Sequence, residues 1–395
     1  MLSTNHIPEG WVESTLGSAV EILSSKRIFA ADYVSDGIPF YRSKEIIEKS
    51  KGGTISTPLF ITEKRYNDIK EIFGAPVNGD LLISAVGDRA GIPYYIKDDG
   101  DFYFKDGNLI WFRNFNEKLS SHYLCYFLKS RIGQYKLDSL MIGSAQKALT
   151  IVGIKSMKLL LPPLPEQKAI ANVLTAFDDK IELLQAQNKT LETMAQTIFK
   201  EWFGKYQIED ELPEGWRVGK LGEIVTPLKG KNITKKQVIT GKYPVIAGGL
   251  KPSVFHNVCN TKSPVLTVSA SGANAGYVAL HHNPVWSSDS TFIDISFTDS
   301  FYFIYVFLKN NQSLIFDKQE GSAIPHVYPR HLENLDIVIP NFIELEKYEK
   351  VAENFFNKIS NNTSQILSLT KTRDTLLPKL MSGQVRVNHQ KLQSS

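Results

Sequence analysis

A dense group of lysines is the most conspicuous candidate for chemistry in this chain. Lys229, Lys231, Lys235 and Lys236 fall within one short segment, beside glycine and polar residues. Lysine carries a point charge on a flexible stem, so such a loop is better suited to phosphate oxygens than to the edges of bases. The cluster therefore predicts a surface that binds a nucleic-acid backbone.

Other loops combine basic residues with polar types that grip phosphates or read base edges. These loops lie at corresponding places in the two halves of the chain. In the first half, the predicted DNA contacts are Ser25, Lys26, Arg27, Arg42, Ser43, Lys44, Arg89, Gln146 and Lys147. In the second half, besides the four lysines, they are Ser271, Asn274, His326, Tyr328 and Arg330. For any one of these residues, a solvated loop is the competing interpretation.

Catalytic motifs are missing from the sequence. Residues 283–286 (NPVW) lack the second proline of an adenine methyltransferase motif and predict a turn before a strand. The glycine fragments near residues 228–231 and 240–242 lack the spacing of a phosphate-binding loop. His281 and His282 have no partner at metal-ligand spacing. We expect no catalytic residue, metal site or cofactor in this chain.

The bulk composition limits the possibilities further. At 395 residues the chain is long enough for two cores, and its net charge of only +4 requires any DNA-binding charge to be concentrated locally. Two cysteines form neither a disulfide framework nor a four-thiolate zinc site. Without a signal pattern or a long apolar run, we expect a cytoplasmic protein with no membrane contact.

The elements that position these loops belong to a tandem repeat. Residues 7–17 (IPEGWVESTLG) and 212–222 (LPEGWRVGKLG) match at an offset of 205. The Gly-Ser-Ala triplets at 143–145 and 321–323 match at an offset of 178, so the second copy is about 27 residues shorter. In the front part of each copy, residues 80–86 and 264–269 are strand-like, whereas 123–128 and 301–308 are helix candidates.

The back part of each copy predicts one long helix. Apolar residues recur at alternating spacings of three and four from Ile170 to Trp202 and from Tyr348 to Leu380. This spacing is typical of a coiled-coil seam rather than of the broader stripe on a helix that lies on a domain.

An asparagine interrupts each seam, and the two positions differ. If the helices run antiparallel with flush ends, Asn188 falls opposite Asn362. A parallel alignment would instead set each amide against hydrocarbon, at a cost of roughly 1–3 kcal/mol for each unpaired amide. The two asparagines therefore predict an antiparallel coiled coil within one chain and fix its register. The competing interpretation is that each faces solvent or a partner subunit.

A seam of this length spans about 50 Å, at about 1.5 Å per residue. Two domains held at its ends would be related by a pseudo-two-fold axis. They could reach major grooves of B-DNA that return to one face about every 34–36 Å. If the domains bind DNA, the geometry predicts a split, asymmetric site with an unread gap.

The residues at the helix entry carry a resemblance to a known family. The run from Leu161 to Leu174 (LPPLPEQKAIANVL) and the EGW…LG opening of each half resemble type I restriction–modification specificity subunits. The second copy departs from the pattern, with residues 340–344 (PNFIE) in place of the entry and no Glu-Gln pair.

The resemblance implies a mixed α/β fold with two target-recognition domains separated by an antiparallel two-helix coiled coil. We expect recognition domains at 1–160 and 207–340, long helices at 161–206 and 341–386, and a tail at 387–395. The partners would be double-stranded DNA, two methyltransferase (modification) subunits and two endonuclease (restriction) subunits. S-adenosylmethionine, ATP and Mg would bind to those subunits, and DNA methylation and cleavage would be their chemistry.

Partner subunits should contact the outer faces of the coil and the helix entries. Leu183, Phe199 and Phe356 lie off the seam, and we expect them to be exposed apolar contacts for a partner. Two rival functions remain. One is a specificity subunit of a related, type II-like system, and the other is a coiled-coil scaffold whose domains bind proteins rather than DNA.

Overall fold

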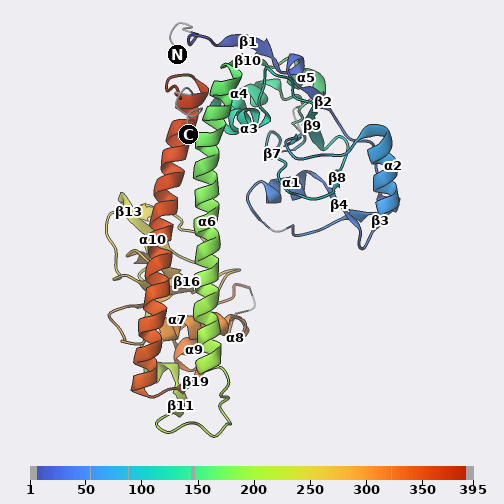
Figure 1. The fold of residues 1–395 in the computed structure, drawn as a ribbon. Coiled ribbons are helices and arrows are strands. Elements are labelled where there is room, and N and C mark those ends of the chain that lie inside the picture. Colours follow the sequence, from blue (N-terminus) through green and yellow to red (C-terminus); the bar gives the residue numbers. More distant parts are fainter. Residues whose placement is uncertain (1–6, 54, 88, 144–146, 322, 388–395) are drawn as a thin grey trace. The chain divides into compact units, whose positions relative to one another are not determined.

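The computed structural model describes residues 7–53, 55–87, 89–143, 147–321 and 323–387. The chain forms two compact units (Figure 1). Unit 1 comprises residues 1–181 and 368–395, and unit 2 comprises residues 182–367. Helix α6 (Leu164–Trp202) therefore begins in unit 1 and ends in unit 2, whereas α10 (Phe342–Met381) begins in unit 2 and ends in unit 1.

Unit 1 contains two small sheets. The first consists, in spatial order, of β2 (Glu21–Leu23), β9 (Leu109–Arg113), β6 (Leu81–Ser84) and β7 (Pro93–Tyr95), all antiparallel. The second consists of β3 (Tyr33–Val34), β5 (Phe60–Ile61), β4 (Ile38–Tyr41) and β8 (Tyr103–Phe104), with β4 and β8 parallel.

Unit 2 repeats this topology. Its first sheet consists of β12 (Leu228–Lys229), β18 (Ser290–Asp294), β15 (Val265–Ser269) and β16 (Val278–His281). Its second sheet consists of β14 (Phe255–His256), β13 (Thr240–Ile246) and β17 (Trp286–Ser287), with β13 and β17 parallel. The tandem repeat predicted from the sequence is confirmed, because every described strand of these two sheets in unit 2 has a counterpart in unit 1, whereas β3 of unit 1 has none in unit 2.

The length difference between the copies has a structural explanation. Unit 1 inserts α1 (Ser43–Lys49) and α2 (Glu63–Phe73) between β4 and β6. The corresponding segment of unit 2, residues 247–264, forms only β14 and no helix. Most of the residues missing from the second copy therefore belong to these two helices.

Helices cover the sheets in both units. They are α3 (Ser121–Lys129), α4 (Arg131–Leu140) and α5 (Ile151–Lys155) in unit 1, and α7 (Phe301–Asn310), α8 (Gln312–Asp317) and α9 (Pro329–Glu333) in unit 2. Residues 301–308 of α7 are all buried, as expected for a helix that is apolar on every side. The predictions of a helix over 123–128 and over 301–308 are confirmed.

A two-stranded ribbon leads into each long helix. In unit 1, β1 (Val12–Thr15) pairs antiparallel with β10 (Lys158–Leu161), and in unit 2, β11 (Arg217–Lys220) pairs with β19 (Asp336–Ile339).

The glutamine of the Glu-Gln pair at the first helix entry holds the fold together. Gln167 is fully buried, accepts a hydrogen bond from Ser120 N and donates to the carbonyl oxygens of Pro162 and Lys118. Gln167 therefore anchors α6 to the start of α3 and is not available to a partner.

Helices α6 and α10 run antiparallel in each unit. In unit 1, Arg373 of α10 donates to Asp178 of α6 at 2.6 Å, and Ile170 and Leu380 belong to one core. In unit 2, the Trp202 and Tyr348 rings lie 6.1 Å apart at the far end of the pairing. The predicted antiparallel fold is confirmed by these contacts.

The two asparagines meet in unit 2. Asn362 is fully buried and its Nδ2 donates to Asn188 Oδ1 at 2.9 Å, while Asn188 Nδ2 lies 3.4 Å from Thr363 Oγ1. A buried amide requires a partner, because an unpaired one loses the hydrogen bonds that water would supply. The pairing thus favours this register over a slipped one.

The prediction that Phe199 and Phe356 are exposed is wrong. Phe199 is 7% exposed and Phe356 only 1%, and both belong to the core of unit 2. Phe356 stacks on Tyr302 of α7 at 4.9 Å, and Phe199 packs against Phe303 at 5.2 Å. In unit 2 the long helices bury a second stripe against α7, so their apolar surface is broader than a two-helix seam. Leu183 is 50% exposed, as expected.

The asparagine layer predicts an asymmetric mutational response. Asn188→Leu removes the 2.9 Å acceptor of the fully buried Asn362 amide, leaves it only the longer 3.4 Å contact to Gln187 Oε1, and should destabilise unit 2 by about 1–3 kcal/mol. Asn362→Leu should cost less, because the half-buried Asn188 reaches water. The double variant should recover most of the loss, measured by urea unfolding. A double variant less stable than Asn188→Leu would contradict the pairing.

Candidate nucleic-acid interface

In unit 1, the glycine turn after β6 is joined to the Gly-Ser-Ala loop. Gly87 N donates to Lys147 O at 2.9 Å, and Leu149 N donates to Ala85 O at 2.8 Å. Gly87 has a φ of 90° and open space where a Cβ would lie. Glycine is needed there for its backbone conformation rather than for lack of room. We call the described residues of these two joined segments, 84–87 and 89–91 with 142–143 and 147–149, the paired turn of unit 1.

Unit 2 contains the same arrangement. Gly272 N donates to Pro325 O and Val327 N donates to Ala270 O, both at 3.0 Å. Gly272 has a φ of 82°, again with nothing near the position of a Cβ. Residues 269–276, together with the described residues 320–321 and 323–327, therefore form the paired turn of unit 2.

A second loop in unit 1 collects the other predicted segments. This central loop, residues 103–108, comprises β8 and the turn after it, and it accepts hydrogen bonds from three directions. Ser25 Oγ donates to Phe104 O at 2.7 Å, and Ser43 Oγ donates to Asn108 O at 2.7 Å. Ala85 N, from the paired turn, also donates to Asn108 O, at 2.8 Å. The predicted segments 25–27 and 42–44 and the paired turn, which carries the predicted Arg89, are thus gathered around one loop.

The central loop of unit 2, residues 286–290, has the same role. Gly230 N donates to Ser290 O at 2.7 Å and Lys231 N donates to Ser287 O at 2.9 Å, which attaches the lysine segment. Ala270 N, from the paired turn, donates to Asp289 O at 3.1 Å. Both units therefore build one polar surface from a basic segment, a central loop and a paired turn.

Comparison with known proteins identifies the family. A family model described as type I restriction modification DNA specificity domain matches residues 8–193 and 213–391. The chain belongs to this family. The two matches correspond to the two copies of the repeat, so the chain carries two target-recognition domains.

Individual relatives agree. The chain is 29% identical over 317 residues to the type I restriction enzyme MjaIX specificity subunit of Methanocaldococcus jannaschii, covering 70% of this chain and 72% of the relative. It is 24% identical over 274 residues to a putative type I specificity subunit of Mycoplasma genitalium, covering 67% and 71%. The crystal structure of an S subunit from M. genitalium shares the fold, with a TM-score of 0.65 and 20% identity over 96% of this chain and 98% of that one.

In the first target-recognition domain, the predicted side chains differ in availability. Lys26, Arg89 and Lys147 are exposed and pair with no acidic residue among those described. Arg42 is committed to the structure, because it binds the fully buried Glu45, and that hydrogen bond raises the pKa of the Arg42 guanidinium. Arg27 pairs with Asp106 at 2.9 Å.

Two further predicted residues of this domain have different outcomes. Lys44 is exposed and lies 4.0 Å from Glu48. Gln146 falls outside the described residues.

In the second target-recognition domain, all four lysines are exposed, and none forms an ion pair with a described residue. The other predicted residues lie on or beside the paired turn. Ser271 forms an isolated β-bridge with His326 and donates to the Asp289 carboxylate. The His326 and Tyr328 rings stack at 5.8 Å, and the Arg330 guanidinium lies 4.6 Å from the Tyr328 ring while pairing with Glu320.

The last predicted residue, Asn274, also lies on the paired turn. Its Nδ2 lies 3.3 Å from Gly248 O.

The central loops are what sequence reasoning missed. Asn108 and Asp289 are near-equivalent positions whose backbone carbonyls organise each surface. Trp286 adds a hydrogen bond from its Nε1 to Lys231 O, so it supports the lysine segment. Every residue type has a backbone carbonyl, so these acceptors cannot be identified from the sequence. The polar residues after each short strand were only a weak signal.

The described residues also bear on metal sites and membrane spans. Among the described residues, no group of three or more His, Cys, Asp or Glu could hold a metal ion, and no described helix is long and apolar enough to cross a membrane. His281 donates to or accepts from Thr267 Oγ1 at 2.9 Å, and burial lowers its pKa to about 4. It is therefore neutral near pH 7.

The conformation of the paired turn predicts that replacing its glycine with alanine lowers the stability of the domain. Gly272→Ala should destabilise the second domain by about 1–2 kcal/mol, because an L-residue is strained at a φ of 82°. Gly249→Ala is the matched control, since its Cβ would only touch the Lys251 carbonyl at 3.5 Å. Equal stability of the two variants in urea unfolding would show that the turn does not hold this conformation.

Proposed function

We propose that this chain reads a bipartite, asymmetric site on double-stranded DNA and holds the enzymatic subunits of a type I restriction–modification complex. One observation carries the proposal: both domains build the same surface from the same backbone hydrogen bonds, but present different side chains on it. A shared frame with variable side chains suits the reading of two different short sequences.

Base reading would come from the paired turns. Unit 1 presents Arg89 and Lys147 there, where unit 2 presents Asn274 and Pro325. Arginine and lysine suit the acceptors of guanine, whereas asparagine suits adenine. The two domains would therefore prefer different bases at corresponding positions of their half-sites.

Backbone contacts would come from the basic segments beside the paired turns. The exposed lysines at 229–236 supply unpaired positive charge where the net charge of the whole chain is small. Such contacts set position and affinity rather than sequence preference.

The antiparallel helices would set the gap between the half-sites. Each of the 39- and 40-residue helices is longer than the repeat of the major groove, at about 1.5 Å per residue. Domains held on such helices would reach grooves one turn apart and leave the bases between them unread.

Catalysis would belong to the partners. We propose two methyltransferase subunits, which bind S-adenosylmethionine, and two endonuclease subunits, which bind ATP and Mg, with this chain as the non-catalytic reader. The two-copy stoichiometry is suggested by the internal repeat, because each copy contributes one long helix.

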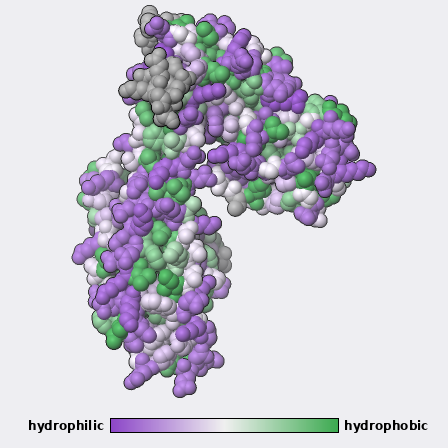
Figure 2. Space-filling model, viewed as in Figure 1, coloured by the Kyte–Doolittle hydropathy of each residue, from purple (hydrophilic) through white to green (hydrophobic). Residues whose placement is uncertain are grey.

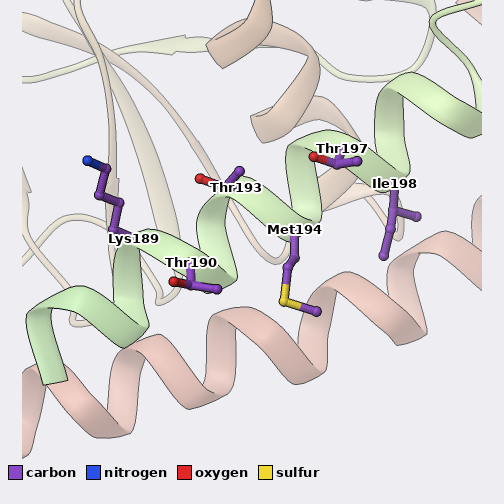
Figure 3. A pocket seen from close by; sticks show the side chains of 6 residues that line it. All are labelled: Lys189, Thr190, Thr193, Met194, Thr197 and Ile198. Carbon is purple, nitrogen blue, oxygen red and sulfur yellow. The ribbon is translucent and has the colours of Figure 1, made fainter. Parts of the chain in front are cut away.

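A partner-binding surface is supported along the exposed part of α6 in unit 2. There α6 lines a cavity of about 360 Å³ with Lys189, Thr190, Thr193, Met194, Thr197 and Ile198 (Figure 3). Met194 is 43% exposed and Leu183, on the same helix, is 50% exposed. Figure 2 shows hydrophobic areas on the surface of this unit. Contact with a protein partner is more favourable for such areas than contact with water.

Two rival functions make different predictions. A specificity subunit of a type II-like system would bind DNA in the same way but with a different nuclease, which the neighbouring genes would identify. A scaffold for proteins alone would give no footprint. Footprinting with the modification subunit present should show two protected segments separated by an open gap, and a single or absent footprint would contradict the bipartite reading.

The lysine segment predicts a sequence-independent loss of affinity. Changing Lys235 and Lys236 to alanine should weaken binding to all duplexes and reduce the salt slope by up to about two. The matched control changes Lys358 and Lys371, which are exposed on α10 and form no ion pair with a described residue. Affinity and salt slope measured by fluorescence anisotropy should change only for the first pair, and an unchanged slope there would refute phosphate contact.

The helix surface predicts a loss of partner binding without loss of DNA-reading capacity. The double change of Leu183 and Met194 to serine should weaken binding of a purified modification subunit by about tenfold, since two apolar contacts are lost. Ile239→Ser is the control, because Ile239 is 62% exposed but lies in the β-rich part of the domain. Equal binding by the double variant and the control would rule out this surface.

A further inference from the structure

The first helix entry holds an arginine from the other end of the chain. Glu166 is only 1% exposed, and Arg386 binds both of its carboxylate oxygens, at 2.5 and 2.8 Å. Arg386 also donates to the Glu9 carbonyl at 3.1 Å. The arginine arrives on a peptide segment whose Gly383 packs tightly against Pro8. Unit 1 thus contains a complete socket in which a buried carboxylate receives a guanidinium.

The second helix entry has the carboxylate but not the arginine. Glu344 follows Glu166 at the repeat offset of 178. Its Oε2 is buried and accepts no hydrogen bond from a described residue. The segment after α6 that corresponds to the arginine-bearing one, residues 203–211, contains no arginine. A buried carboxylate oxygen without a donor is costly, and a charged donor is its best partner.

Space for such a donor lies beside Glu344. A cavity of about 390 Å³ is lined by Glu344, Trp202, Tyr206, Trp216 and Lys347, among others. Its aromatic walls suit a planar guanidinium, which stacks on rings while it binds a carboxylate with two parallel hydrogen bonds. Lys205 and Lys347 also line this cavity, yet neither forms an ion pair with Glu344 among the described residues.

We propose that Glu344 and this cavity receive an arginine carried on a segment of the modification subunit, as Glu166 receives Arg386. The identity of the partner rests on the proposed function. The chemistry of the socket does not depend on that function. A polypeptide is the occupant because the filled socket in unit 1 is filled by a peptide segment. An arginine is the anchor because the second copy has kept the acceptor and lost the donor.

The chemistry is tested with a peptide probe. The probe is Ser-Gly-Gln-Val-Arg-Val, the sequence of residues 382–387, beside a copy with norleucine in place of arginine. Calorimetry should detect binding of the arginine peptide to the full chain and at least about tenfold weaker binding to the Glu344→Gln variant. Glu346→Gln, an exposed site one residue from the socket wall, is the matched control and should bind normally. Equal binding of both peptides, no binding of the arginine peptide, or unchanged binding by Glu344→Gln overturns the socket.

The source of the arginine is tested with the purified modification subunit. Its affinity for the full chain should fall about tenfold for Glu344→Gln and stay unchanged for Glu346→Gln, while both variants keep the melting temperature of the unmodified chain. If the peptide result holds but the modification subunit binds Glu344→Gln normally, the assignment of the partner is wrong. Footprinting of the same complexes separates this from the proposed function: loss of the split footprint by the unmodified chain would refute the function and leave the peptide result standing.

Discussion

The need to bury one amide pair in a particular register constrains the whole molecule. Asn362 is fully enclosed, and Asn188 supplies the acceptor for its Nδ2. Only the antiparallel alignment gives both amides a polar neighbour. Once that alignment is set, each long helix must begin in one unit and end in the other. The chain therefore builds each unit from one front part, half of its own helix and half of the other.

The long helices do more than pair with each other. In unit 2, Phe199 and Phe356 complete the core under α7, and in unit 1, Ile170 and Leu174 complete the core with α3. A helix that belongs to a coil on one side and to a domain core on the other is stiffly attached at both. This attachment supports a function in which recognition surfaces are held in fixed positions on each unit.

The two units repeat the same backbone contacts but differ in the side chains that they present. The central loops and paired turns repeat the same backbone hydrogen bonds at distances that agree within a few tenths of an ångström. The side chains on them differ between the units, as do the inserted helices α1 and α2. The same division occurs at the helix entries, where the acceptors Glu166 and Glu344 repeat but, among the described residues, only Glu166 binds an arginine.

The sequence by itself determined the repeat, the long helices and the asparagine pairing, because each rests on spacing along one chain or on the cost of a single unpaired amide. It also located the segments that form both polar surfaces. Tertiary structure alone decided which side chains of those segments are free. Arg42 is committed to Glu45, and Phe199 and Phe356 are covered by α7, because coverage depends on elements distant in sequence. The central loops were likewise invisible, since their acceptors are backbone carbonyls that every residue type possesses.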